Sequence, residues 1–145
     1  MIKNIKNKTI FILNIKDLGF STKINFSFSS TKLEPIAVYE NYLLDNPNIL
    51  YNNIGKSAIY RWVRIKSNKS YVGSSKDLSR RLRNYYNINF LKRIVLTGHS
   101  PIYRALLDEG YERFKLEILE YCDEKVIIER EQHYINLLKP EYNKV

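Results

Sequence analysis

The pattern of apolar and polar positions changes near residue 57. Before it, the short β-prone runs Thr9–Ile15 and Lys23–Phe28 are broken by glycine and by serine and threonine, and they show no helical period. After it, Ala58–Ile65 is rich in aromatic and β-branched residues, Lys66–Lys69 is polar, and Ser70–Gly73 resumes a strand-like pattern. The pattern therefore predicts a β-hairpin at the start of an ordered domain.

Helices are expected on both sides of a third strand. Ser74 or Ser75 can cap a helix that runs to about Tyr86, with Asp77 near its positive end. A second helix is expected between Ser100 and Gly110, because the proline that follows Ser100 suits a first helical turn.

Downstream, apolar residues at 114, 116 and 118 alternate with charged ones, which indicates a strand. Val126–Leu138 then has a helical period that Pro140 ends. The resulting order is strand, strand, helix, helix, strand, helix. It predicts a compact α/β domain with a small three-stranded antiparallel sheet flanked by helices.

Three segments are expected along the chain. Residues 1–33 form an N-terminal extension of uncertain order, and residues 34–57 form a linker or packing arm with a short helix at Glu40–Leu44. Residues 58–145 form the α/β domain, which has no internal repeat.

Charge and cysteine content narrow the class of protein. The chain has 145 residues, a net charge of +9 and a pI near 9.6, which favours a polyanionic partner such as nucleic acid. The single cysteine, Cys122, can form neither an internal disulfide nor a cysteine-based zinc site, so an intracellular setting is favoured. Lysine or asparagine interrupts every long apolar stretch, so no membrane span is expected.

The last helix places a carboxylate among apolar side chains. At about 100° per residue, Glu131 falls in the middle of the stripe formed by Ile127, Tyr134, Ile135 and Leu138. A carboxylate that loses hydration there needs a compensating cation. Two interpretations follow: an ion pair with a nearby arginine, or a ligand for a hard metal such as Mg²⁺.

The hairpin supplies two tyrosines. With a four-residue turn, Arg64 lies opposite Tyr71 and Trp62 lies opposite Gly73, so Tyr60 and Tyr71 share a face. Both phenols then reach one site. The alternative is that these are ordinary half-buried strand residues, and a loop one residue longer or shorter would separate them.

The helix after the hairpin is rich in arginine. Arg81 flanks its apolar stripe and can present its guanidinium to a cleft, where the planar fork fits phosphate. Arg80 and Arg83 face outward, as solvated residues or nonspecific phosphate contacts. His99 precedes a helix start, where anions bind, although a lone histidine is more often structural.

Together, these residues resemble a known family. Ala58-Ile59-Tyr60, Tyr71-Val72-Gly73, the arginine helix and the glutamate within Ile-Glu-Arg-Glu resemble the GIY-YIG nuclease domain, especially that of homing endonucleases encoded in fungal mitochondrial introns. Tyr85-Tyr86, Ile102-Tyr103 and the closing Pro140-Glu141-Tyr142-Asn143 extend the resemblance over the second part of the chain. Ala58 and Val72 depart from the family's glycine and isoleucine.

The resemblance implies a metal-dependent DNA endonuclease that hydrolyses phosphodiester bonds. It implies a mitochondrial location, Mg²⁺ or Mn²⁺ as cofactor and double-stranded DNA as partner, and it points to no membrane and no obligate protein partner. The implied catalytic residues are Tyr60, Tyr71, Arg81, His99, Glu131 and Asn143, with Glu131 as the metal ligand and Arg80, Arg83 and Lys76 as DNA-binding residues. A tyrosine, Tyr60 with the help of Tyr71, would orient or deprotonate the attacking water.

Two other interpretations remain open. One is a repair or branch-processing nuclease with the same domain, and the other is a decayed nuclease that only binds nucleic acid. Homing enzymes of this family usually add a separate DNA-recognition region after the nuclease domain, whereas this chain ends at Val145. We therefore expect weak binding and little sequence specificity, because phosphate contacts position a protein without reading sequence.

Overall fold

The computed structural model describes residues 2–5, 8–11 and 32–144, and the chain divides into two compact units, residues 1–34 and 35–145. In the first unit, strands β1 (Ile2–Ile5) and β2 (Lys8–Phe11) pair in antiparallel orientation. The expected run Lys23–Phe28 lies outside the described residues, and of Thr9–Ile15 only Thr9–Phe11 lies within β2.

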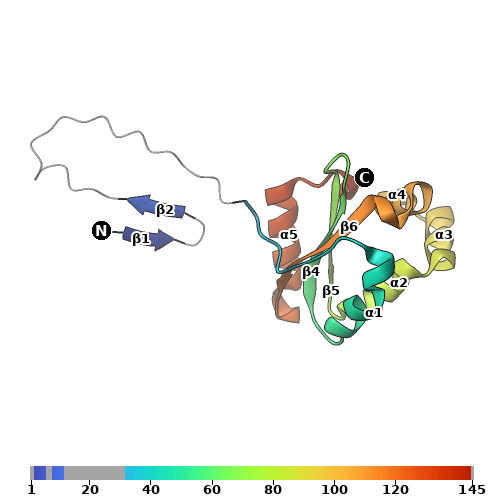
Figure 1. Ribbon diagram of the computed structural model, residues 1–145, viewed down its shortest axis with the longest axis horizontal. Coiled ribbons are helices and arrows are strands. Elements are labelled where there is room, and N and C mark those ends of the chain that lie inside the picture. The colour runs from blue at the N-terminus through green and yellow to red at the C-terminus, as the bar shows by residue number, and fades with distance from the viewer. Residues whose placement is uncertain (1, 6–7, 12–31, 145) are drawn as a thin grey trace, which may run out of the picture. The chain divides into compact units, whose positions relative to one another are not determined.

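The second unit contains four strands and five α-helices within the described residues (Figure 1). The strands are β3 (Ala37–Tyr39), β4 (Ala58–Arg64), β5 (Ser70–Ser75) and β6 (Phe114–Tyr121). The α-helices are α1 (Tyr42–Asn52), α2 (Leu78–Tyr86), α3 (Ile88–Thr97), α4 (Pro101–Glu109) and α5 (Ile127–Leu138). Short 3₁₀ turns are η2 (Tyr111–Arg113), η3 (Glu124–Val126) and η4 (Glu141–Asn143).

The sheet of the second unit is antiparallel and has the strand order β3-β6-β4-β5. The expectation of three strands is therefore wrong by one. The additional strand, β3, comes from the segment expected to be a linker or packing arm, and Val38 lies opposite Glu117 of β6. The expected helix at Glu40–Leu44 is also longer and begins later, as α1.

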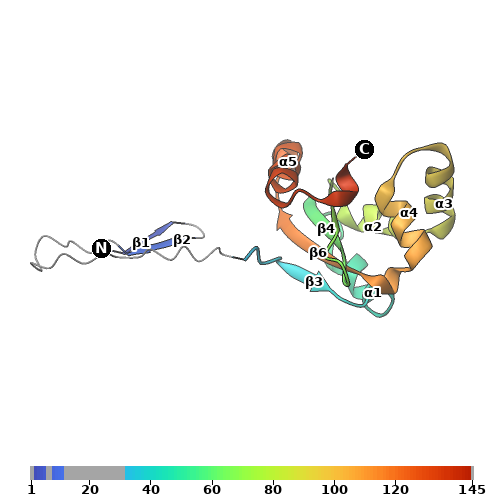
Figure 2. The same ribbon diagram turned by 90° about the horizontal axis from the view of Figure 1, so that it is seen from above.

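Helices cover both faces of the sheet. In Figure 2, α5 lies on one side of the strands and α1 to α4 lie on the other. The main core fills the side of α1 to α4, and its buried residues are Ile49, Ala58, Tyr60, Trp62, Leu78, Leu82, Tyr85, Leu91, Ile102, Tyr103, Leu106, Phe114, Leu116 and Ile118. On α5, the stripe predicted from its period is confirmed: Ile127 and Tyr134 are buried and Glu131 is half-buried.

Two helix starts differ from the sequence-based expectation. The cap of α2 is Asp77 itself, whose carboxylate accepts a hydrogen bond from the backbone N–H of Arg80 at 3.1 Å, rather than Ser74 or Ser75. Helix α3 was not expected. It begins at Asn87, which ends α2 and also caps α3 by accepting from the backbone N–H of Phe90.

The remaining elements match the pattern. Helix α4 begins with Pro101 and ends at Gly110, whose φ of 87° is available to glycine at little cost. Strand β6 and helix α5 lie where alternation and helical period predicted them. None of the described helices is both long and apolar enough to cross a membrane.

Candidate active site

The β4–β5 hairpin brings the two motif tyrosines to one face of the sheet. Trp62 lies opposite Tyr71, and Tyr60 lies opposite Gly73. The pairing differs by two residues from the expected register, in which Trp62 lay opposite Gly73. Because side chains alternate with a period of two, this shift preserves the face that each side chain occupies. The predicted proximity of Tyr60 and Tyr71 is confirmed, with ring centroids 6.4 Å apart.

Gly73 is required by the close approach of both rings. A Cβ atom at this position would lie 2.6 Å from Cζ and the hydroxyl of Tyr60 and 2.8 Å from Cε1 of Tyr71. Tyr60 is fully buried and cannot move aside at low cost. The glycine of the second motif therefore makes room for the tyrosines rather than for Trp62.

Four tyrosines, one each from β4, β5, α2 and α4, meet at this hairpin, and we call Tyr60, Tyr71, Tyr85 and Tyr103 the tyrosine cluster. The hydroxyls of Tyr60 and Tyr85 are 3.0 Å apart and hydrogen-bonded. The Tyr85 ring packs edge-on against Tyr60 at 5.8 Å and against Tyr103 at 5.1 Å. Tyr85 also lies close enough to Tyr71 for the two phenols to influence each other electrostatically. Helices α2 and α4 thus complete a site that the hairpin begins.

Arg81 enters this cluster from α2. Its side chain is half-buried, and it lies close enough to Tyr85 and Tyr103 for its charge to interact with their phenols. Its charge also acts on the phenols of Tyr60 and Tyr71. The prediction that this arginine presents its fork at the edge of an apolar stripe agrees with that placement, which leaves guanidinium N–H groups for a bound anion.

Glu131 approaches the cluster from α5. It is half-buried and close enough to Tyr71 for its negative charge to affect that phenol. Within residues 32–144 it forms no ion pair, so the structure does not support the alternative of an arginine salt bridge. By contrast, the neighbouring Glu120 accepts hydrogen bonds from Arg130 at 2.7–3.0 Å.

Burial raises the pKa of three phenols, those of Tyr60, Tyr71 and Tyr85, and keeps them protonated. It raises the pKa of Tyr60 and of Tyr85 well above the usual value near 10, and the charge of Arg81 offsets only part of this effect at Tyr60. Burial raises the pKa of Tyr71 as well, and the negative charge of Glu131 adds to the effect. At neutral pH these hydroxyls are therefore hydrogen-bonding groups rather than phenolates.

Asn143 holds the hairpin from the outside. Its side-chain oxygen accepts from the backbone N–H of Val72 at 2.8 Å, and its amide donates to the Val72 carbonyl at 2.8 Å. Glu141 accepts from the backbone N–H of Ser70 at 2.9 Å. The two side chains of η4 thus pair with the open edge of β5, so Asn143 positions the strand that carries Tyr71.

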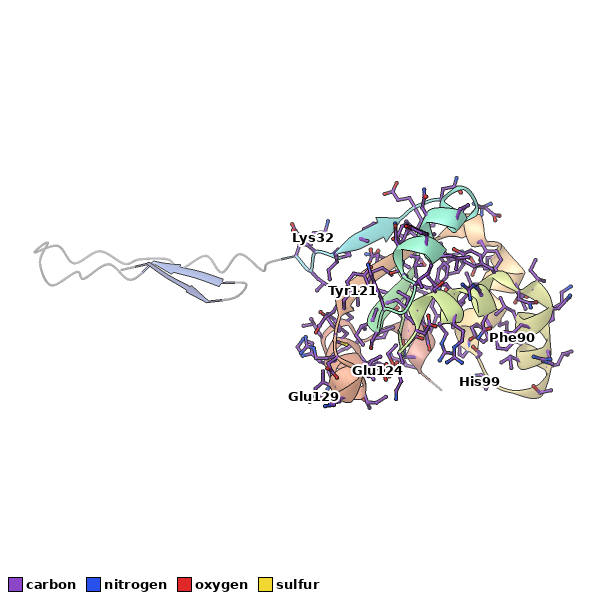
Figure 3. The ribbon with its side chains drawn as sticks, turned by 90° about the horizontal axis from the view of Figure 1, so that it is seen from below. Lys32, Phe90, His99, Tyr121, Glu124 and Glu129 are labelled. Atoms are coloured by element: carbon purple, nitrogen blue, oxygen red, sulfur yellow. The ribbon has the colours of Figure 1, made fainter. Side chains whose placement is uncertain are left out.

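The structure does not bring His99 to the cluster. His99 is exposed between α3 and α4 (Figure 3), and within residues 32–144 it shares no hydrogen bond or ring contact with the four tyrosines. Of the expected DNA-binding residues, Arg80 and Arg83 are exposed on α2. Lys76 is also exposed, and its ammonium lies 3.7 Å from the carboxylate of Glu124.

Tyr85 and Tyr103 are cluster members that sequence reasoning did not select. Tyr85 falls on the apolar stripe of its helix, and it is buried. The missed signal is its hydroxyl, because a buried tyrosine usually has a hydrogen-bonding partner inside the protein. For Tyr103 no pattern pointed to Arg81, since the contact joins two helices that are not adjacent along the chain.

The donor set fits a hard cation bound through few protein ligands. No group of three or more histidine, cysteine, aspartate or glutamate side chains gathers anywhere in the described part of the chain. At the tyrosine cluster, the carboxylate of Glu131 has no cationic partner among residues 32–144. Mg²⁺ typically keeps several waters and binds through one or two carboxylates and substrate phosphates, which is compatible with this set.

The two departures from the motif are accommodated locally. Ala58 is fully buried within the main core and has no positive φ, so its methyl group meets no backbone requirement for glycine. Val72 is also fully buried.

The fold and the cluster define an antiparallel α/β domain in which two motif strands present paired tyrosines to an arginine and a glutamate. The family model described as "GIY-YIG catalytic domain" matches residues 56–144. The chain therefore belongs to the GIY-YIG family, and the prediction of an endonuclease domain is confirmed.

Two solved structures are similar to this chain. The catalytic domain of intron endonuclease I-TevI, in a mutant form, is 31% identical, with 58% of this chain and 84% of that chain covered and a TM-score of 0.47. The catalytic domain of homing endonuclease I-TevI is 32% identical, with 59% and 91% covered and a TM-score of 0.47.

Proposed function

We propose that this protein is a metal-dependent endonuclease of the intron-homing type, which hydrolyses phosphodiester bonds in double-stranded DNA. The observation that carries the proposal is Glu131, a half-buried carboxylate without an ion pair in the described residues, at the tyrosine cluster that Arg81 also enters. The homing type and a mitochondrial location are proposed from the sequence motifs.

Glu131 would hold the Mg²⁺ or Mn²⁺ ion, which supplies a Lewis acid for the scissile phosphate when bound. Arg81 binds the non-bridging phosphate oxygens and neutralises charge that builds up on them. One preorganised donor of this kind contributes about 10²–10³ in rate. A cation with free N–H groups beside a metal-binding carboxylate is thus suited to a phosphodiester and not to a neutral substrate.

Tyr71 and Tyr60 have different roles in the proposed reaction. Tyr71 is partly exposed, between Glu131 and the buried phenols, and it orients the attacking water through its hydroxyl. Tyr60 is 1% exposed and hydrogen-bonded to Tyr85, so we assign it the role of fixing the cluster rather than that of the base. His99, near the N-terminus of α4, binds a phosphate further along the DNA.

The experiment compares nicking of supercoiled DNA by wild type, Glu131→Gln and Glu129→Gln, with Mg²⁺, with Mn²⁺ and with EDTA. Glu129 is a matched control because it is exposed on the same helix (Figure 3). We expect nicking by wild type to require metal, and Glu131→Gln to lower it at least about 10²-fold. Glu129→Gln should retain it.

Two results would contradict this proposal. Equal nicking by Glu131→Gln and Glu129→Gln would remove Glu131 from the metal site. A folded wild type that binds DNA but cuts neither supercoiled, branched nor damaged DNA with either metal would support the decayed nuclease instead. A strong preference for branched or damaged DNA would support the repair nuclease.

A further inference from the structure

Charge is unevenly distributed along the described domain. Residues 78–107, which form α2, α3 and most of α4, contain six arginines and lysines and no aspartate or glutamate. The next segment, residues 108–131, contains nine acidic residues and four basic ones. The three helices share one side of the sheet (Figure 2), so the positive charge is concentrated in one layer of the molecule.

The cations of this layer also differ in their partners. Arg61, Arg64, Lys115 and Arg130, on the strands and on α5, each form an ion pair with a glutamate. The exposed cations of α2 to α4 form none with any residue in the described range 32–144; they are Arg80, Arg83, Lys92, Arg93 and Arg104. Charges that no carboxylate neutralises are available to an external polyanion.

One of these cations is connected to the tyrosine cluster by ring contacts. The guanidinium carbon of Arg93 lies 5.6 Å from the centroid of the Phe90 ring. Phe90 packs against Tyr103 at 6.2 Å, and Tyr103 packs against Tyr85 at 5.1 Å. Stacking on an aromatic face fixes an arginine and leaves its in-plane N–H groups free to bind phosphate.

We propose that α3 is a second DNA-contacting element, in which Lys92 and Arg93 bind backbone phosphates that flank the phosphodiester held at the tyrosine cluster. This inference rests on the proposed function, because the polyanion that reaches the cluster is taken to be duplex DNA. Phe90 is the positioning residue that holds Arg93. The contacts are to phosphates and therefore add affinity without reading sequence.

The test compares two double variants that lose the same charge. Lys92→Gln/Arg93→Gln removes the α3 pair. Arg113→Gln/Lys125→Gln removes one arginine and one lysine that are also exposed and form no ion pair in the described domain, but lie in the acidic segment. Binding to a fluorescent duplex of arbitrary sequence is measured by anisotropy in EDTA, from about 50 to 200 mM salt.

The slope of log K against log salt is negative, and in the α3 variant it should be shallower by about 0.9 for each lost phosphate contact, so by about 1.8 in total. The control variant should keep the slope of wild type. Phe90→Leu, which removes the ring but no charge, should weaken binding about two- to fivefold. Circular dichroism and thermal unfolding of each variant establish that the domain is folded.

An unchanged slope for Lys92→Gln/Arg93→Gln, or an equal fall for Arg113→Gln/Lys125→Gln, overturns the inference. Because binding is measured without metal, the outcome is separate from cleavage. If wild type nicks DNA and both double variants keep the salt dependence of wild type, the role of α3 is refuted and the nuclease function is not. If the chain never cuts DNA but the α3 variant has a reduced slope, the DNA-binding role of α3 is supported and the proposed nuclease activity is refuted.

Discussion

Tyr60 and Tyr85 are buried beside each other, and their hydroxyls lie 3.0 Å apart. A buried hydroxyl without a partner would cost free energy, so each of these groups satisfies the other. Ionisation of either would place a negative charge in the core. The pair therefore acts at neutral pH as a fixed, neutral hydrogen-bonded unit that shapes the site around Arg81 and Tyr71.

This arrangement predicts a loss of stability at alkaline pH. Burial raises the pKa of Tyr60 and Tyr85 well above that of the unfolded chain, near 10, and it raises the pKa of Tyr111 to about 12. Above about pH 10 the unfolded chain releases protons that the folded chain retains, so the free energy of unfolding falls as pH rises. Below that pH these groups add no pH dependence. Urea unfolding measured from neutral pH to about pH 11 checks this.

The double variant Tyr60→Phe/Tyr85→Phe is the control. It removes both hydroxyls together and leaves neither unsatisfied, so the fold should survive at neutral pH. In this variant, the free energy of unfolding should fall less steeply at alkaline pH than in wild type. If the free energy of unfolding falls equally steeply in wild type and in the variant, other groups cause the decline.

Much of the site could be predicted at the residue scale because periodicity alone fixes which side chains share a face. The positions of Tyr60, Tyr71 and Glu131 follow from strand alternation and from one helical wheel. The role of Tyr85 was missed because a tyrosine on an apolar stripe looks like any core aromatic until its partner hydroxyl is known. The exposure of His99 depends on how α3 and α4 are connected, which no local pattern reveals.

Among the elements, β5 is held on one edge by contacts from a distant part of the sequence. One of its edges pairs with β4, and the backbone groups of Ser70 and Val72 on the other edge pair with Glu141 and Asn143. These contacts join residues 71 positions apart in the chain. They complete an otherwise open strand edge, as a further strand would.

Asn143→Ala should therefore lower stability and activity together. It leaves the backbone N–H and carbonyl of Val72 without their partner, which costs about 1–3 kcal/mol in the free energy of unfolding. Because Tyr71 precedes Val72 on the strand, nicking should fall more than the unfolded fraction accounts for. Urea unfolding and nicking at matched folded concentrations measure both effects.

Asn136→Ala is the matched control, since Asn136 is exposed on α5 and its amide oxygen accepts a hydrogen bond from Gln132, which is also exposed. We expect a change within about 0.5 kcal/mol and normal nicking. Equal effects of the two substitutions would show that the hydrogen bonds between Asn143 and Val72 contribute neither to stability nor to nicking.

Two elements that the sequence did not predict, α3 and β3, have weak local signals in the sequence. Helix α3 starts at the residue that ends α2, so Asn87 looks like a helix end although its side chain caps the next helix. Strand β3 has only three residues, and its pairing with β6 is far from local. By contrast β4, β6 and α5 are long and periodic; the bounds of β4 and α5 were predicted to within one residue, and β6 continues three residues beyond the predicted Ile118.

For the whole molecule, the family match and the compact unit have different starting points. The family model begins at residue 56, whereas the compact unit begins at Pro35. The segment between them supplies β3, at the edge of the sheet, and α1, whose Ile49 is fully buried in the main core. The compact unit that carries the motifs thus includes elements that precede the first of them.

Asn53, directly after α1, connects this segment to the rest of the domain. Its amide donates to the carbonyl of Ile49 at 2.7 Å, and its side-chain oxygen accepts from the hydroxyl of Tyr121 at 2.8 Å. Its backbone carbonyl accepts from the N–H of Ser79 at the start of α2. One fully buried polar residue therefore joins α1, β6 and α2.

Two truncations test how far the domain extends. Removal of residues 1–34 should leave cooperative unfolding within about 1 kcal/mol of wild type, because residues 35–145 form a compact unit. Removal of residues 1–57 strips β6 of an edge strand, exposes the core around Ile49 and leaves the hydroxyl of Tyr121 without Asn53. The loss of Ile49 alone corresponds to about 2–5 kcal/mol, a large part of the stability of a small domain. Thermal and urea unfolding of both truncations measure this difference. If the shorter chain unfolds with the same midpoint and cooperativity as the longer one, β3 and α1 do not stabilise the domain. The nuclease domain then begins at its first motif.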